Sequence, residues 1–380
     1  MEIHGRCDSR FAKVKDAFAK NFAVGNEVGA SFAATWNGEL VVDLWGGSAD
    51  RAGTRPWQRD TLANVWSTTK AMAALCTHVV VDRGLVDLDA PVATYWPEFA
   101  AQGKERMPVR WLLSHQSGLS GLTPPFPTEA ALDWQRFCAA LAAQKPLWEP
   151  GTRSGYEALT FGNLVGEVVR RVDGRSLGRF FREEVAEPLG AEFWIGLPES
   201  QEKLVAEMIP PDPAAPLAAQ PEPGDPSYEL RAALATPRVT PEIANTRAWR
   251  AAEVPAGNGQ ANARGAALCM AALANGGSLG GVRIMSESSV ARAITEQCYG
   301  RDLVLGYPMR WGLGFMLVSK DLPLSPNPRT FGHGGWGGSF ALADCDARVS
   351  LAYVMNRMSQ GTVGDKRLGR LLRAFYAGLD

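Results

Sequence analysis

Hydrophobic positions near the start of the chain follow a helical period and then change to a strand-like pattern. The spacing predicts an amphipathic helix over residues 9–22, whose apolar face carries Phe11, Val14, Phe18 and Phe22. Residues 30–36 and 39–45 are rich in strand-forming side chains and flank Asn37-Gly38, a pair typical of a two-residue turn with positive φ. The first part of the chain therefore predicts a helix followed by a β-hairpin.

Helical patterns dominate the middle of the chain. A helix-forming run follows Ser67 and ends at Arg83-Gly84, with glycine where helices usually stop. Further helical segments are predicted at residues 109–116, 158–172 and 176–190. Residues 208–226 are rich in proline, which removes backbone donors and disfavours helix, so we expect a long surface loop there.

Strand patterns return toward the end of the chain. A helix is expected at about 262–275, strands at 311–318, 338–345 and 348–355, and a closing helix at about 364–378. Strands at both ends with helices between them predict an α/β fold of the α+β kind, an antiparallel sheet flanked by helices with an inserted all-helical lobe. The predicted domains are residues 1–66 with 240–380, and residues 67–239, with the active site in the cleft between them.

The composition is that of an ordinary globular protein and narrows the choice of function. Lysine and arginine number 39 against 40 acidic residues, which leaves no positive excess for binding nucleic acid. Charges run through the first residues, and no apolar run is long enough for a signal peptide or a membrane helix. The six cysteines form no CxxC pair, so we expect buried thiols in a cytoplasmic protein.

The tetrapeptide Ser67-Thr68-Thr69-Lys70 matches the S-x-x-K pattern, in which serine and lysine share one helix face. A serine hydroxyl needs a base to remove its proton, and a lysine can do so only when burial or nearby cations lower its pKa. The helix start also offers backbone N–H groups to a developing oxyanion. Alone the signal is weak, because Ser200 to Lys203 also matches it, among the charged residues of an expected surface helix start.

Two further segments contain residues that could reach the same site. Tyr156 lies in a loop directly before a predicted helix, where a phenol can either enter a cleft or pack as a partly buried loop residue. Residues 331–340 are rich in glycine at the edge of a predicted strand, which suits either close approach to a ligand or a tight turn.

Together with 112-LLSHQSGL-119 and 149-EPGTRSGY-156, these segments resemble the serine β-lactamase and penicillin-binding-protein superfamily, and most closely the family VIII carboxylesterases. The resemblance covers most of the chain and implies a β-lactamase/transpeptidase-like fold of the class C kind. It implies that Ser67 is the acylated nucleophile and that Lys70 and Tyr156 share the acid/base work, without deciding which is the base. It also implies an oxyanion hole made by the N–H groups of Ser67 and Trp336, and substrate binding by His333, Gly334, Gly335 and Trp336.

Two departures from the penicillin-recognising members bear on the substrate. His333-Gly334-Gly335 stands where those enzymes have Lys-Thr-Gly, so a cation and a hydroxyl that grip a substrate carboxylate are missing. Tyr156-Glu157-Ala158 stands where they have Tyr-x-Asn, so the amide that binds a lactam side-chain carbonyl is missing. Both departures favour neutral esters over lactams.

Several other residue patterns are weaker candidates. Gly276 to Gly280 satisfies the G-x-S-x-G pattern of α/β-hydrolases, but around Ser278 a helix precedes and a strand-like segment follows, which is the wrong order. The four histidines show no metal-ligand spacing; we expect His115 to be structural and His333 to line the cleft. An aromatic wall near the cleft is expected to favour small acyl groups, with the candidates Trp134, Trp148 and Trp336.

The sequence thus predicts a serine carboxylesterase that hydrolyses short-chain or small neutral esters through an acyl-enzyme on Ser67. We expect no cofactor, no metal, and no partner beyond a small-molecule ester. Alternatives with the same acyl-enzyme are a β-lactamase, a D-amino-acid peptidase or amidase, and an acyltransferase. A non-catalytic ligand-binding relative is a more remote alternative, and the oligomeric state is left open.

Overall fold

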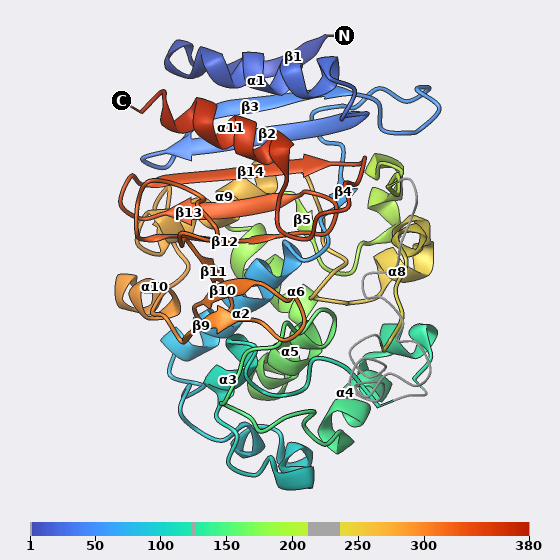
Figure 1. Cartoon of the computed structure of the whole chain (residues 1–380), viewed down its shortest axis with the longest axis vertical. Coiled ribbons are helices and arrows are strands. Elements are labelled where there is room, and N and C mark those ends of the chain that lie inside the picture. The colour runs from blue at the N-terminus through green and yellow to red at the C-terminus, as the bar shows by residue number, and fades with distance from the viewer. Residues whose placement is uncertain (1, 124–125, 212–235, 380) are drawn as a thin grey trace.

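Nine of the described strands form one antiparallel sheet made from both ends of the chain (Figure 1). The structure, a computed structural model, describes residues 2–123, 126–211 and 236–379. The order across the sheet is β1-β3-β2-β14-β13-β12-β11-β10-β9. The early strands are β1 (Ile3–Cys7), β2 (Gly29–Trp36) and β3 (Glu39–Gly47). The late strands are β9 (Cys298–Arg301), β10 (Pro308–Trp311), β11 (Met316–Leu317), β12 (Thr330–Gly334), β13 (Phe340–Asp344) and β14 (Val349–Met355).

The pairing of β2 with β14 joins the two chain ends at the centre of the sheet, with Val349 opposite Trp36 and Met355 opposite Ala30. The predicted hairpin is confirmed, because Asn37 and Gly38 take φ values of 52° and 84° between β2 and β3. The predicted strand at 311–318 is wrong in its continuity. Trp311 pairs with Met316 across a turn that contains Gly314 at φ 87°, so this segment folds back as a hairpin instead of running straight.

Helices cover both faces of the sheet. On one face lie α1 (Ala12–Ala23) and α11 (Lys366–Tyr376), joined by stacked rings of Phe11 and Phe375 at 4.6 Å (Figure 1). On the other face lies α9 (Ala263–Ala274), whose Ala267 carbonyl accepts a hydrogen bond from Ser350 of β14 at 2.8 Å. Alternate residues of a strand point to opposite faces, so both faces of this sheet must be apolar, as the buried central strands are.

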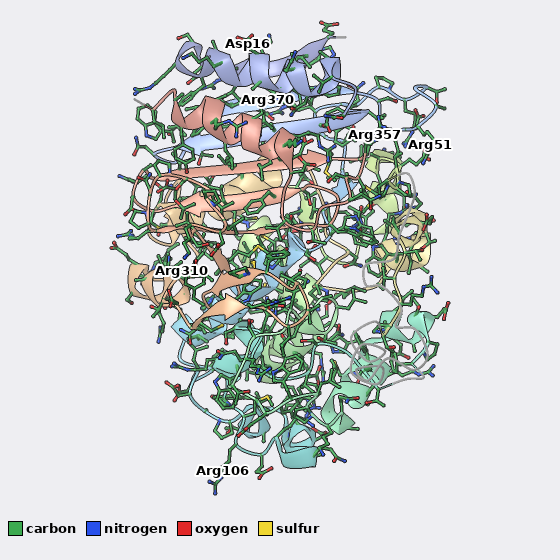
Figure 2. All side chains as sticks on the ribbon, viewed as in Figure 1. Asp16, Arg51, Arg106, Arg310, Arg357 and Arg370 are labelled. Atoms are coloured by element: carbon green, nitrogen blue, oxygen red, sulfur yellow. The ribbon has the colours of Figure 1, made fainter. Side chains whose placement is uncertain are left out.

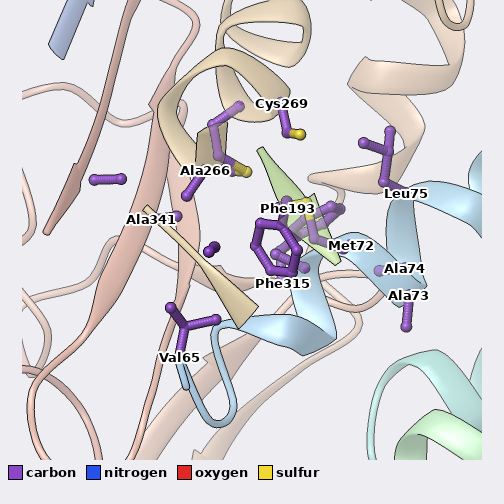
Figure 3. Packing of buried hydrophobic residues seen from close by; sticks show 14 of the residues in the cluster. Val65, Met72, Ala73, Ala74, Leu75, Phe193, Ala266, Cys269, Phe315 and Ala341 are labelled. Atoms are coloured by element: carbon purple, nitrogen blue, oxygen red, sulfur yellow. The ribbon is translucent and has the colours of Figure 1, made fainter. Parts of the chain in front are cut away.

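A mainly helical region lies beyond the sheet and surrounds the buried helix α2 (Thr69–Asp82). Apart from a few polar residues α2 is apolar, and its residues from Thr69 to Val81 are all buried, as expected of a helix inside the protein. Figure 3 shows Met72 of α2 beside Phe193, and both belong to one core cluster with Cys269 of α9 and Ala341 of β13, which connects this helix to α9 and to the sheet. The other helices of this region are α3 (Val109–Leu113), α4 (Trp134–Ala143), α5 (Thr160–Asp173) and α6 (Leu177–Phe181), the last continued by a π-helical turn (Arg182–Ala186).

Smaller elements connect the two regions. A three-stranded sheet is formed by β4 (Ala63–Asn64), β6 (Gln260–Ala261) and β5 (Phe193–Trp194), and a hairpin by β7 (Ser278–Leu279) and β8 (Val282–Arg283). Two further α-helices in the described part of the chain are α8 (Arg247–Ala251) and α10 (Glu287–Ala293), and 3-10 turns include Pro97–Gly103, Glu199–Leu204 and Pro241–Asn245. Most of the predicted proline-rich loop, residues 212–226, lies outside the described residues, and the domain boundaries stay a prediction.

Charged side chains lie mostly at the surface, as Asp16 and Arg106 do in Figure 2. A few are fully buried, including Lys70, Lys104, Glu157 and Asp302. Buried ionisable groups are rare unless they are paired or hydrogen-bonded, so each of these needs a physical explanation. Across the described parts of the chain, no helix is both long enough and apolar enough to cross a membrane.

Candidate active site

Ser67 lies in a tight turn between β4 and the first residue of α2. Trp66, directly before it, takes a φ of 46°, a left-handed conformation that costs a non-glycine residue roughly 1–2 kcal/mol. Backbone hydrogen bonds hold this turn, with the Thr69 N–H donating to the Trp66 carbonyl at 2.9 Å and the Lys70 N–H to the Ser67 carbonyl at 3.0 Å. Strain of this kind persists only where the surroundings enforce it, and it often marks a functional site.

Lys70 lies one turn into the helix, and its amine reaches the Ser67 hydroxyl at 3.1 Å. The same Nζ donates to the carbonyl oxygens of Ala158 at 2.7 Å and Ala256 at 3.0 Å. Burial lowers the pKa of Lys70 well below its usual value, and the nearby Glu157 opposes this only in part. A neutral amine has two N–H groups and one lone pair. The two carbonyls can take the N–H groups, which leaves the lone pair for the Ser67 proton.

Glu157 is a buried carboxyl group close to this lysine. It accepts a hydrogen bond from the Ser117 hydroxyl through Oε1, and its Oε2 lies 3.4 Å from His115 Nδ1. The Glu157 N–H donates to the same Nδ1 at 3.2 Å, so that ring nitrogen is an acceptor and His115 is neutral. Burial raises the pKa of Glu157 well above its ordinary value and lowers that of His115. An uncharged, protonated carboxyl group is therefore the form that this buried position favours.

Tyr156 brings its phenol within hydrogen-bonding reach of the Ser67 hydroxyl. Its ring stacks on Trp311 at 5.9 Å with an interplanar angle of 6°, and the Lys70 amine lies 4.7 Å from the ring centroid. Burial raises the pKa of Tyr156 far above its usual value, so the phenol keeps its proton. The structure thus brings together the three side chains that the sequence predicts.

The glycine-rich turn between β12 and β13 packs directly on the Ser67 turn. Ser339 donates to the Val65 carbonyl at 2.8 Å and lies 3.1 Å from the Thr68 hydroxyl. An added Cβ on Gly335 would fall 2.2 Å from that same carbonyl, so glycine is required for this approach. Among the described residues, the N–H groups of Ser67 and Trp336 have no hydrogen-bond acceptor, which leaves both free to bind an oxyanion.

His333 lies on β12 and is buried behind the phenol, its ring centroid 6.1 Å from that of Tyr156. Its Nδ1 lies 2.8 Å from the Gly334 carbonyl. Burial lowers the pKa of His333 to about 3, so the imidazole is neutral. A neutral ring at this position supplies no cation for a substrate carboxylate.

The other candidates lie elsewhere. Ser278 lies in the short strand β7 with helix α9 before it, the reverse of a strand-to-helix elbow, and Ser200 lies in an exposed 3-10 turn. Trp134 donates to Glu167 on α5 at 2.7 Å, so its ring is held by the helical region. The described residues contain no group of three or more His, Cys, Asp or Glu side chains placed to hold a metal ion.

Sequence reasoning missed part of the surroundings of Ser67. Trp66 packs against Trp336 at 5.0 Å and against Trp249 at 5.8 Å, so two of these three rings were not among the expected aromatic residues. The position of Trp66, directly before the serine, was a usable signal. Trp249 lies 182 positions downstream of Ser67 in sequence, and only the fold brings it to the site.

A buried serine in reach of a lysine and a tyrosine, beside backbone N–H groups that have no acceptor among the described residues, is the active-site arrangement of a serine hydrolase. The chain belongs to the beta-lactamase family, whose family model matches residues 15–374. The family resemblance, the β-lactamase-like fold and the serine hydrolase class that the sequence predicted are confirmed.

Similar proteins bear out this assignment. The esterase/beta-lactamase LipL of Mycobacterium tuberculosis is 37% identical over 371 residues, which span 94% of this chain and 83% of that protein. A crystal structure of a family VIII carboxylesterase is 50% identical with a TM-score of 0.93 and full coverage of both chains. A penicillin-binding protein homologue from Caulobacter crescentus is 44% identical with a TM-score of 0.92, again over the whole of both chains.

Proposed function

We propose that the protein is a serine carboxylesterase in which Ser67 attacks the carbonyl carbon of a small neutral ester. The observation that carries this proposal is the hydrogen bonding around one hydroxyl, with the Lys70 amine at 3.1 Å and the Tyr156 phenol as its second partner. Nucleophile and base within hydrogen-bond reach are the signature of covalent catalysis. The similarity to a family VIII carboxylesterase and to LipL supports the same reaction.

Lys70 is the general base in this proposal. Its neutral amine takes the Ser67 proton as the Oγ–C bond forms, and the resulting ammonium donates to Ser67, Ala158 and Ala256. The Tyr156 phenol then gives its proton to the leaving alcohol and recovers one from Lys70, so the net change is the transfer of one proton from the serine to the alcohol. In the second half, water releases the acid, and its proton returns to Ser67 by the reverse route.

The oxyanion of the tetrahedral intermediate is stabilised by the N–H groups of Ser67 and Trp336 in this proposal. Neither group has another acceptor in the described structure, and the Ser339 hydroxyl, which donates to the Val65 carbonyl at 2.8 Å, holds the two turns together. Losing one such donor typically costs about 2.7–4 kcal/mol of transition-state stabilisation.

Neutral esters are the proposed substrates because the His333 imidazole is uncharged where penicillin-recognising relatives carry a lysine. The rings of Trp66 and Trp336 beside the serine favour short acyl groups. β-Lactams are the second candidate, supported by the name of LipL as both an esterase and a beta-lactamase. The proposed location is the cytoplasm, in keeping with six free cysteines.

Stopped-flow hydrolysis of p-nitrophenyl butyrate by wild type, Ser67→Ala and Ser278→Ala tests this proposal, with nitrocefin as a parallel substrate. We expect Ser67→Ala to abolish ester turnover, Ser278→Ala to leave it unchanged, and nitrocefin to be a slow substrate. Equal ester turnover by Ser67→Ala and wild type would remove Ser67 as nucleophile. Faster cleavage of nitrocefin than of the ester would change the assignment to a β-lactamase.

A further inference from the structure

Asp302 is a fully buried acidic residue that the proposed mechanism does not use. It lies in the loop between the edge strands β9 and β10. Its Oδ1 accepts three backbone hydrogen bonds, from Val304 at 2.9 Å, from Leu305 at 3.0 Å and from Tyr156 at 3.0 Å. The first two close the loop on itself. The third hydrogen bond connects Asp302 to Tyr156, which lies 146 positions away in the sequence.

The backbone around Tyr156 has no helix or strand to hold it, because α5 begins only at Thr160. Consecutive N–H groups are instead held one at a time. Gly155 donates to the His115 carbonyl at 2.8 Å, Tyr156 to Asp302, and Glu157 to the His115 ring at 3.2 Å. The Leu303 N–H also donates to the Ser154 carbonyl at 3.0 Å. The Asp302 loop is therefore hydrogen-bonded to this segment at both Ser154 and Tyr156.

We propose that Asp302 is a positioning residue that fixes the Tyr156 backbone against the edge of the sheet and so sets the place of the phenol beside Ser67. The proposal rests on the acid/base role proposed for Tyr156. The ring has a second contact on the same hairpin, because it stacks on Trp311 at the end of β10. Backbone and ring of this tyrosine are thus both fixed by one structural unit, β9–β10.

The consequence for the rate follows from the precision that proton transfer requires. A displacement of about 1 Å at a reacting group can cost around 100-fold in rate. Removing the acceptor in Asp302→Ala frees the Tyr156 N–H, and we expect kcat to fall about 10- to 100-fold with KM changed less than threefold. Asp302→Asn keeps an oxygen that can accept the same three N–H groups. We expect its kcat to stay within about threefold of wild type.

Stability must be separated from positioning, because Asp302 is buried. Asp344 provides a matched control, since it is equally buried and its Oδ1 accepts backbone N–H groups from Asp346 and Ala347 at 3.0 Å. Asp344→Ala should lower the urea midpoint and leave kcat unchanged. If Asp302→Ala does not fold, Asp302→Ser takes its place, because a serine hydroxyl is too short to reach all three donors.

The deciding experiment is a double-mutant cycle with Tyr156→Phe, using p-nitrophenyl butyrate and kcat as the readout. If Asp302 acts through the phenol, Asp302→Ala lowers kcat in the wild-type background and has no further effect in the Tyr156→Phe background. An equal fold-loss in both backgrounds, or unchanged kcat in Asp302→Ala, would overturn the inference and leave the proposed function standing. Full activity of Tyr156→Phe would instead overturn the role of Tyr156 and the inference with it.

Discussion

Replacing Lys70 by methionine should remove the base without emptying the space that the lysine fills. Loss of general-base catalysis typically costs 10²–10⁴ in rate, and each factor of ten corresponds to about 1.4 kcal/mol, so the barrier should rise by roughly 2.7–5.4 kcal/mol. The substitution also takes a hydrogen-bond donor from the carbonyls of Ala158 and Ala256. At about 1–3 kcal/mol for each unpaired buried group, the loss of stability is at most about 2–6 kcal/mol. It should be smaller in practice, because methionine has no amine to desolvate.

Lys104 is a matched control for this prediction. Its amine is equally buried and donates to three carbonyls, those of Ala101, Ala142 and Gln144 at 2.8, 2.9 and 2.6 Å, with no serine hydroxyl among them. Both variants should lower the urea midpoint, but only Lys70→Met should slow the stopped-flow release of p-nitrophenolate. A Lys70→Met rate within tenfold of wild type would refute the argument, as would an equal loss of rate in Lys104→Met.

Three further predictions concern the surroundings of Ser67. Because the amine must be neutral to accept a proton, kcat/KM should fall as pH drops through the Lys70 pKa, which burial lowers from 10.5; a pH–rate profile with its acid limb at or above pH 10.5 would contradict this. Glu157→Gln should keep kcat within about threefold, since glutamine is uncharged like a protonated carboxyl group and its amide oxygen can accept from Ser117, and a loss above tenfold would indicate a carboxylate instead. Gly335→Ala should lower kcat about 10²–10³-fold, because the added Cβ would force the turn that carries the Trp336 N–H away from the Val65 carbonyl. Gly300→Ala is the control and should leave kcat unchanged, since an added Cβ there meets nothing within 4 Å. Equal rates for the two variants would argue against the proposed oxyanion hole.

The sequence is informative where short-range chemistry decides the structure. Asn37-Gly38 tolerates the positive φ that a two-residue hairpin needs, and the apolar run after Ser67 can only be a buried helix that stops near Gly84, whose φ is +73°. The roles of Ser67, Lys70 and Tyr156 were predicted from the resemblance to a known family, because neither the S-x-x-K match nor the loop tyrosine is specific alone. The first strand, β1, was not predicted. It is short and mostly exposed, so it has no hydrophobic pattern of its own, and it forms by pairing with β3.

Long-range contacts account for what the sequence does not reveal. Nothing near Asp302 in the chain points to Tyr156, and the contact exists only because the β9–β10 hairpin lies at the edge of the sheet beside the tyrosine segment. The neutral state of His333 likewise follows from complete burial, which the motif His333-Gly334-Gly335 does not specify. The helix expected over 176–190 ends early at Phe181 and continues as a π-helical turn, a change of hydrogen bonding that propensity does not resolve.

The most direct test of the central claim is to trap the acyl-enzyme. Wild-type protein is mixed with p-nitrophenyl butyrate, quenched in acid within the first turnovers, digested and mapped by mass spectrometry. The account predicts one butyryl group on the peptide that contains Ser67, and its absence when Ser67→Ala is treated in the same way. A butyryl group on the peptide that contains Ser278, or turnover with no acylated peptide at all, would contradict it.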